Sequence, residues 1–153
     1  MDFIFKNNFV SIESEKKVIV FGWDYIDVDG LRIDMAGEYE KWGFLAYAHE
    51  FADVRIYQMR IEGYTVGYLS NNLQDLSSEQ LDFLWDLDVL VMPTSKSSIP
   101  LLEKIEPCFL ITYGETAHEL ATSMGFSEPQ VSKYKLREAD LSGEKMGVVV
   151  MGE

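Results

Sequence analysis

The side chains of this sequence that could support metal chemistry include only two histidines, His49 and His118. A catalytic zinc site holds neutral imidazoles and carboxylates as ligands and leaves one coordination position open to water. Glu115 and His118 are three positions apart, so on a helix they would share a face and could bind a metal together. Two ligands do not make a site. We therefore interpret His118 as a structural or exposed helix residue, and His49, near a strand end, in the same way.

A second candidate site is the polar segment 94–98, which precedes a predicted helix. Free N–H groups at a helix amino terminus can receive a phosphate or carboxylate, and Lys96 adds positive charge. Ordinary helix capping explains the same residues, so both interpretations stay open. A rebuilt anion or substrate pocket would lie between Pro93 and Glu115. Its lining residues would be Ser95, Lys96, Tyr113, Glu115 and His118.

Nucleophilic and calcium chemistry find less support. Cys108 lies in an apolar run that predicts a buried strand, where a thiol is usually inert. Neither a Gly-x-Ser-x-Gly elbow nor a phosphate-binding glycine-rich loop occurs. Asp24, Asp27 and Asp29 precede Gly30, but placing Gly30 sixth in a calcium loop puts a tyrosine first and an alanine last, where carboxylates are needed. We predict no catalytic nucleophile and no calcium site.

Length and composition predict one domain spanning residues 1–153, because 153 residues can bury a single core. No stretch approaches the roughly 20 apolar residues that cross a bilayer, so we expect no membrane association. The start lacks the pattern of a signal peptide and the single cysteine excludes an intrachain disulfide, which favours a cytoplasmic location. The net charge of −13 would repel a phosphate backbone, so we expect no nucleic-acid partner.

The elements that would position these residues begin with β-hairpins over residues 1–70. Short β-rich runs occupy positions 3–5, 9–12 and 18–21. Asp29-Gly30 is a two-residue turn that needs positive φ and joins strands 25–28 and 31–34. Across that turn, buried faces would be shared by Ile26, Val28, Leu31 and Ile33. Glu62-Gly63 joins strands 54–61 and 64–69, which follow a possible strand at 43–48.

Residues 71–153 predict a βα-rich half. Ser77 and Gln80 form a capping box, and the helix that follows runs to about Asp86 with an apolar face of Leu81, Leu84 and Trp85. Strands 89–92 and 108–112 flank a helix at 98–105, so they should be parallel. A third helix at 116–124 ends at Gly125, and strands near 131–135 and 146–151 follow. The result is a mixed α/β sandwich.

Several of these segments resemble, in order and spacing, one branch of the metallo-β-lactamase superfamily, the lactonase-like hydrolases related to ascorbate-6-phosphate lactonase. The matching segments are Gly37-Glu38-Tyr39-Glu40, Leu76 to Leu81, Leu87 to Pro93 and Ile105 to Ile111. The final helix and last strands are similar too, so the resemblance covers roughly residues 35–153 and, more loosely, the first hairpins. It implies an α/β (α+β) fold class, a metallo-β-lactamase-like αβ/βα sandwich of mixed sheets, truncated here.

The resemblance also implies a metal site, where bound hydroxide attacks an ester, lactone or phosphodiester. The first ligand motif, His-x-His-x-Asp-His, should lie before Gly37. Here the segment 21–25 leads almost directly into the segment 37–40, so the motif is missing. The bridging aspartate falls at Ser70-Asn71-Asn72, where amides are poor ligands. The last histidine corresponds to Gly114. No family ligand can be transferred, so we predict no metal and no cofactor.

The sequence therefore predicts a shortened, metal-free relative that acts in binding, scaffolding or regulation. Loss of the ligand motif with its surrounding elements would uncover part of a sheet, and a homodimer or a related protein partner could cover it. An aromatic-rich segment either packs in the core or forms this association surface; its members are Trp23, Tyr25, Tyr39, Trp42, Phe44, Tyr47 and Phe51. The alternatives are a diverged hydrolase with a rebuilt site, or a subunit that needs a second chain.

Overall fold

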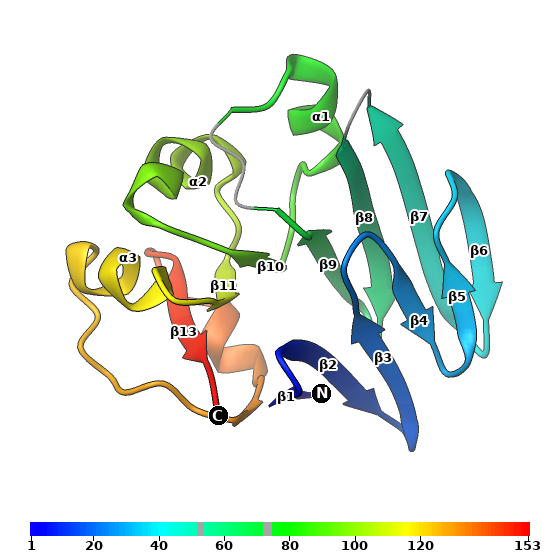
Figure 1. The fold of residues 1–153 in the computed structure, drawn as a ribbon, viewed down its shortest axis with the longest axis horizontal. Helices are drawn as coiled ribbons and strands as arrows, with labels where there is room; N and C mark the ends of the chain where they lie inside the picture. The colour runs from blue at the N-terminus through cyan, green and yellow to red at the C-terminus, as the bar shows by residue number, and fades with distance from the viewer. Residues whose placement is uncertain (52–53, 72–74) are drawn as a thin grey trace.

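The computed structural model describes residues 1–51, 54–71 and 75–153, and it contains two β-sheets stacked face to face (Figure 1). One sheet has six strands in the order β12-β1-β2-β3-β4-β5, and the other has seven in the order β13-β11-β10-β9-β8-β7-β6. In Figure 1 the α-helices lie beside the seven-stranded sheet, on the side away from β1–β5. The predicted mixed α+β sandwich is confirmed.

The six-stranded sheet is antiparallel throughout and is formed by the predicted amino-terminal hairpins together with one strand from residues 133–135. Its strands are β1 (Asp2–Lys6), β2 (Phe9–Ser14), β3 (Lys17–Phe21), β4 (Ile26–Val28), β5 (Leu31–Ile33) and β12 (Lys133–Lys135). Asp29 and Gly30 form the predicted turn with φ of 48° and 95°. Ile26, Val28 and Ile33 are buried as expected, but Leu31 is 36% exposed. Leu31 shares the face of Val28, and its strand lies at the sheet edge with no neighbour beyond it.

The seven-stranded sheet combines an antiparallel half with a parallel half. Its strands are β6 (Gly37–Lys41), β7 (Phe44–Phe51), β8 (Val54–Ile61), β9 (Tyr64–Leu69), β10 (Val89–Pro93), β11 (Phe109–Tyr113) and β13 (Gly147–Met151). β6 to β9 form antiparallel pairs, whereas β10 runs parallel to β9 and β11, and β13 runs parallel to β11. The predicted βαβ unit of β10 and β11 is therefore confirmed.

The helices are α1 (Ser78–Phe83), α2 (Ile99–Ile105) and α3 (Ala117–Ser123), with short 3₁₀ segments η1 (Lys96–Ser98) and η2 (Glu138–Leu141). Ser77 and Gln80 form the predicted capping box. The prediction that α1 reaches Asp86 was wrong, because Leu84 already leaves helical geometry as the C-cap. Leu84 is buried and Leu81 is partly buried, but Trp85 lies beyond the helix and is 72% exposed. Gly125 has the expected positive φ of 90°.

Two apolar cores follow from this layering. The first lies between the sheets and includes Phe3, Ile12 and Phe21 from one sheet and Tyr57 and Tyr68 from the other. The second lies between the seven-stranded sheet and the helices, and includes Leu84, Leu102 and Leu120. In the described ranges, no helix has the length and apolar composition needed to span a bilayer.

Candidate functional site

Side chains from distant parts of the chain meet around the loop between β3 and β4. The resemblance to the metallo-β-lactamase superfamily marks ligand positions before Gly37, at residues 70–72 and at Gly114; Asn72 lies outside the described residues. Tyr68, near the end of β9, donates its hydroxyl hydrogen to the carbonyl oxygen of Gly22. Burial raises the pKa of the Tyr68 hydroxyl most, and the side chain of Tyr113 lies close enough to Tyr68 to help raise it. Two of the marked places are thus joined by tyrosines.

The tyrosine cluster, which we define as Tyr57, Tyr68 and Tyr113, is packed mainly between the sheets. Tyr57 and Tyr68 are buried, and Tyr113 is partly buried. The ring centroid of Tyr68 lies 4.8 Å from that of Phe21 and 6.0 Å from that of Tyr57. The Tyr57 hydroxyl lies 3.2 Å from the carbonyl oxygen of Ile33 and 3.3 Å from that of Asp24. These contacts fix the backbone of the β3–β4 loop against the second sheet.

The cluster hydroxyls stay protonated at neutral pH. Burial raises the pKa of Tyr57 to about 12, against an opposing effect of Arg55. Burial likewise raises the pKa of Tyr113 to about 12, and that of Tyr68 well above its ordinary value. A neutral phenol is a hydrogen-bond donor and a weak metal ligand. The chemistry that this cluster supports is therefore structural hydrogen bonding.

Arg55 holds the same loop from the outside. Its Nη1 donates to the carbonyl oxygen of Asp24 at 2.7 Å and lies 3.2 Å from the Asp24 carboxylate. Its Nε donates to Glu50 Oε1 at 3.1 Å, and its Nη2 contacts the same carboxylate. Burial acts to lower the pKa of Arg55, but Glu50, Tyr57 and Asp24 together outweigh it and raise that pKa. The guanidinium stays charged and ties β8 to the loop.

The loop itself requires glycine at position 22. The N–H of Gly22 donates to the carbonyl oxygen of Tyr25 at 2.9 Å, which makes the loop a tight turn. A Cβ at position 22 would lie 2.2 Å from the nearest ring atom of Tyr25, well inside contact distance. The Tyr25 ring therefore packs directly on the Gly22 backbone.

The donor set of the described residues does not fit a metal centre. Across residues 1–51, 54–71 and 75–153, no three histidine, cysteine, aspartate or glutamate side chains gather closely enough to hold an ion. His49 stacks on Phe83, with ring centroids 4.8 Å apart, and contacts the edge of Phe51. His118 is exposed on α3.

The structure brings the two loops of the predicted anion pocket together. Pro93 pairs with Tyr113 across β10 and β11. The hydroxyls of Thr94 and Thr112 form a buried hydrogen bond of 2.6 Å, and Thr116 donates to the carbonyl oxygen of Thr94 at 2.7 Å. Adjacent parallel strands thus place the segment 94–98 beside the segment 113–116.

The pocket side chains themselves diverge. The N–H of Ser95 is capped by Ser98 Oγ at 3.0 Å, which supports the capping interpretation. Tyr113 joins the tyrosine cluster, whereas Lys96 and Glu115 are exposed. The expectation that Glu115 shares a helix face with His118 was wrong, because α3 begins at Ala117 and Glu115 precedes it. Anion binding by this group stays a prediction.

Two further expectations have structural outcomes. Cys108 is exposed and not in a buried strand, because β11 begins one residue later, at Phe109. Partial burial and the nearby Asp88 and Asp86 raise the pKa of its thiol, so the thiolate is disfavoured. In the rejected calcium loop, Asp27 Oδ1 accepts the N–H of Gly30 at 2.7 Å. That local turn contact explains the carboxylate there.

Sequence analysis missed Arg55, Tyr57 and Tyr68. A signal for the two tyrosines was present in the turn at Glu62-Gly63. A two-residue turn there pairs Ile61 with Tyr64, and counting back along both strands places Tyr57 opposite Tyr68, which is the register observed. Nothing comparable in the sequence links Arg55 to the β3–β4 loop.

Comparisons with known proteins agree with this architecture. A family model described as the beta-lactamase superfamily domain matches residues 8–123. The structure is similar to a crystal structure from Thermotoga maritima described as a Zn-dependent hydrolase of the metallo-beta-lactamase superfamily. The two share 18% sequence identity and a TM-score of 0.78, over 99% of this chain and 98% of that chain. No curated protein matches this sequence.

Proposed function

Because this chain belongs to the beta-lactamase superfamily, we propose that it keeps the superfamily fold as a metal-free, non-catalytic protein that acts in binding, scaffolding or regulation. The observation that carries this proposal is the tyrosine cluster. It joins two of the segments that the resemblance marks for metal ligands, and it does so with neutral phenols bonded to backbone carbonyls. A hydrolytic metal needs imidazoles and carboxylates that converge on one point.

The surroundings of the cluster support the same proposal. Two carboxylates beside the loop, those of Asp24 and Glu50, are paired with Arg55, whose positive charge would oppose a bound cation. The Zn-dependent activity in the description of the Thermotoga maritima protein belongs to that protein. At 18% identity the likeness extends to the fold, and its ligands do not transfer to these residues.

Thermal unfolding with added metal tests this proposal. A resident ion that binds the folded state would raise Tm, with about 2.7 kcal/mol of added stability at a hundredfold excess over Kd. We expect Zn²⁺, Mn²⁺ and Fe²⁺ to leave Tm unchanged, with Mg²⁺ as the matched divalent control. A rise in Tm that saturates at one equivalent of a transition metal would contradict the proposal.

We also propose that the protein associates with a second copy of itself through an apolar surface, which we define as Trp23 and Met35. Trp23 is 70% exposed and Met35 is 66% exposed. The segments that carry them are neighbours, because Tyr57 contacts the carbonyl oxygens of both Asp24 and Ile33. Large exposed apolar side chains that lie close together favour association. A two-fold interface would let one patch cover its own copy.

Sedimentation velocity of matched tryptophan variants tests this association. We expect a dimer for the wild-type chain, and a monomer for Trp23→Ser at the same concentration. Trp85→Ser is the control, because Trp85 is similarly exposed, at 72%, but follows α1 and does not belong to the proposed surface. We also expect salt to strengthen the dimer, because each copy carries a net charge of −13. A wild-type monomer, or equal loss in both variants, would contradict this surface.

A further inference from the structure

The edge strand β13 presents unpaired backbone groups. β13 is the last strand of the seven-stranded sheet and pairs with β11 in parallel register. The N–H of Gly147 donates to the carbonyl oxygen of Cys108 at 3.1 Å, so the Gly147 peptide groups face β11. Because these groups alternate along a strand, those of Val148 and Val150 face away from β11. Within the described part of the chain, no hydrogen bond engages the N–H or C=O of Val148.

The second half of this edge is already paired by a single residue of the segment 126–134. The N–H of Val131 donates to the carbonyl oxygen of Val150 at 3.0 Å, and the N–H of Gly152 donates to that of Val131 at 2.9 Å. Val131 thus forms a one-residue parallel bridge opposite Met151. This contact shows that the outward face of β13 accepts a strand-like neighbour. It stops short of Val148.

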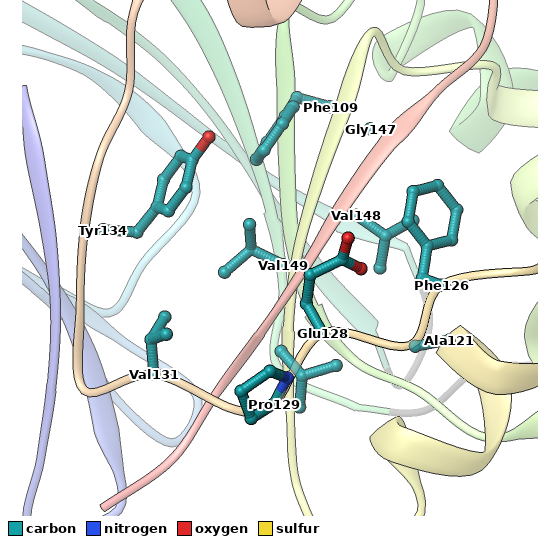
Figure 2. Close-up of a pocket in the computed structure, with 11 residues that line it drawn as sticks. Phe109, Ala121, Phe126, Glu128, Pro129, Val131, Tyr134, Gly147, Val148 and Val149 are labelled. Carbon is teal, nitrogen blue, oxygen red and sulfur yellow. The ribbon is translucent and has the colours of Figure 1, made fainter.

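A hollow of about 340 Å³ lies along the first half of β13. It has one apolar wall on each face of the sheet. Phe126 and Val148 belong to the core under the helices, whereas Phe109, Val131 and Tyr134 belong to the core between the sheets. Figure 2 shows the two groups on opposite sides of the β13 ribbon. The rings of Phe109 and Tyr134 stack with centroids 5.5 Å apart.

These walls match the geometry of an added strand. In an extended segment, consecutive side chains point to opposite faces of the sheet. A segment that pairs with Val148 would direct one side chain toward Phe126 and the next toward Phe109 and Tyr134. A small compact ligand would use one wall and would leave the Val148 peptide groups unpaired.

Charge distinguishes between the possible occupants. Glu128 is exposed and is the one charged residue among those that line the hollow, all of which the structure describes. In the view of Figure 2 its carboxylate lies between the side chains of Val149 and Val148. A second copy would bring another net charge of −13 and another Glu128 to the same place. A basic segment is favoured by both the local and the overall charge.

We propose that the β13 edge binds an extended, apolar and basic segment of another protein. The segment adds as a strand beside Val148, fills the two walls with alternate apolar side chains, and brings lysine or arginine toward Glu128. This is strand addition to an exposed sheet edge, in which the backbone supplies affinity and the pockets supply specificity. The site is separate from the tyrosine cluster and from the apolar surface of Trp23 and Met35.

The probe that tests this proposal is an acetylated, amidated peptide of sequence Lys-Val-Phe-Val-Lys with a fluorescent label. We expect saturable binding with Kd on the order of 10–100 µM, as for a small transient interface. Bound peptide should slow hydrogen exchange at the Val148 amide. The same peptide with both lysines replaced by glutamate should bind several-fold more weakly. Absence of saturable binding of the lysine peptide would overturn the proposal.

Two variants localise the binding. Val148→Pro removes an N–H that β11 does not use, so the fold should persist, as circular dichroism and Tm will show, while binding is lost. Glu128→Lys should weaken binding of the lysine peptide about two- to fivefold. Glu119→Lys makes the same charge change at an exposed position on α3 outside the hollow and should have a smaller effect.

The outcomes separate the occupants. If Glu128→Lys and Glu119→Lys weaken peptide binding equally, binding depends on the overall charge of the protein and not on this hollow. That result would overturn the proposal. Protection of the Val148 amide that rises with protein concentration in the absence of peptide would show that a second copy pairs there. That result would also overturn the proposal. The comparison of the two charge variants and the exchange of the Val148 amide test the proposal even if Val148→Pro does not fold.

Discussion

The tyrosine cluster and the loops around Ser95 and His118 lie at the ends of neighbouring strands, yet they are built differently. The cluster draws on the β3–β4 loop, β8, β9 and β11, and its hydroxyls bond buried backbone carbonyls. The Ser95 loop is capped by its own residues, and Lys96 and His118 are exposed. Polar groups that are buried must be paired, whereas exposed ones can change at little cost. The cluster should therefore carry stability, and the loops should not.

The largest expected loss of stability comes from replacing Tyr68. Tyr68→Ala deletes the ring contacts with Phe21 and Tyr57 and the bond to Gly22, so the free energy of unfolding should fall by about 3–5 kcal/mol. Tyr68→Phe keeps the ring and should cost about 1–3 kcal/mol, because the Gly22 carbonyl loses its partner. Urea denaturation measures both. If Tyr68→Ala stays within about 1 kcal/mol of the wild type, the cluster is not a stabilising element.

Alkaline pH offers a second test. The folded-state pKa of Tyr57 and of Tyr113 is about 12, against an ordinary value of 10.0. Below pH 10 these tyrosines are protonated in both the folded and the unfolded chain, so their full contribution to stability is present. Between pH 10 and 12 the unfolded chain ionises first, and stability should fall by about 1.4 kcal/mol per pH unit for each such tyrosine.

Urea denaturation at each pH, with phenolate absorbance followed in parallel, measures this dependence. Tyr57→Phe should make the fall less steep, since it removes one buried phenol. Stability that holds constant from pH 10 to pH 12, or phenolate that forms near pH 10 in the folded chain, would show that the hydroxyls are exposed.

Arg55 allows a smaller comparison within the same end of the sandwich. Arg55→Met removes the contacts with Asp24 and Glu50 and should lower the free energy of unfolding by about 1–3 kcal/mol. Arg32→Met is the matched control, because the Arg32 side chain is 60% exposed and pairs with Asp34 at 3.5 Å. It should cost about 0–1 kcal/mol. Equal effects in thermal or urea unfolding would place Arg55 among ordinary surface ion pairs.

The smallest effects should come from the loops. His118→Ala and Lys96→Ala change exposed side chains and should each shift the free energy of unfolding by no more than about 0.5 kcal/mol. The double variant should equal the sum of the two. A larger or non-additive loss would contradict this expectation, because it would indicate that these residues contact one another in a formed site.

The parts of the fold that were predicted correctly depend on local chemistry. Asp29-Gly30 and Glu62-Gly63 form two-residue turns because their residues adopt positive φ, and Ser77 with Gln80 caps α1 within a single turn. The errors fall at element ends. Trp85 follows the apolar period but lies beyond the end of α1, and Cys108 belongs to an apolar run whose strand begins one residue later.

The candidate site was harder to predict because its contacts span the chain. Tyr68 reaches Gly22 over 46 positions, and Arg55 reaches Asp24 over 31. The turn at Glu62-Gly63 predicts that Tyr57 lies opposite Tyr68. Which loop the two tyrosines bind depends on how the two sheets stack, and the local sequence does not predict that. The exposed candidates Glu115 and His118 were found from spacing alone, and spacing does not show whether a helix includes both.

Metal content tests the central claim most directly. Elemental analysis by mass spectrometry should be done on the full chain, purified without chelator and without an affinity tag that binds metal. We predict zinc, manganese and iron far below one ion per chain, because Tyr68 and Arg55 bind the loop at residues 22–25 and no three donor side chains gather among the described residues. One or two ions of any of these metals per chain, retained through dialysis, would contradict it.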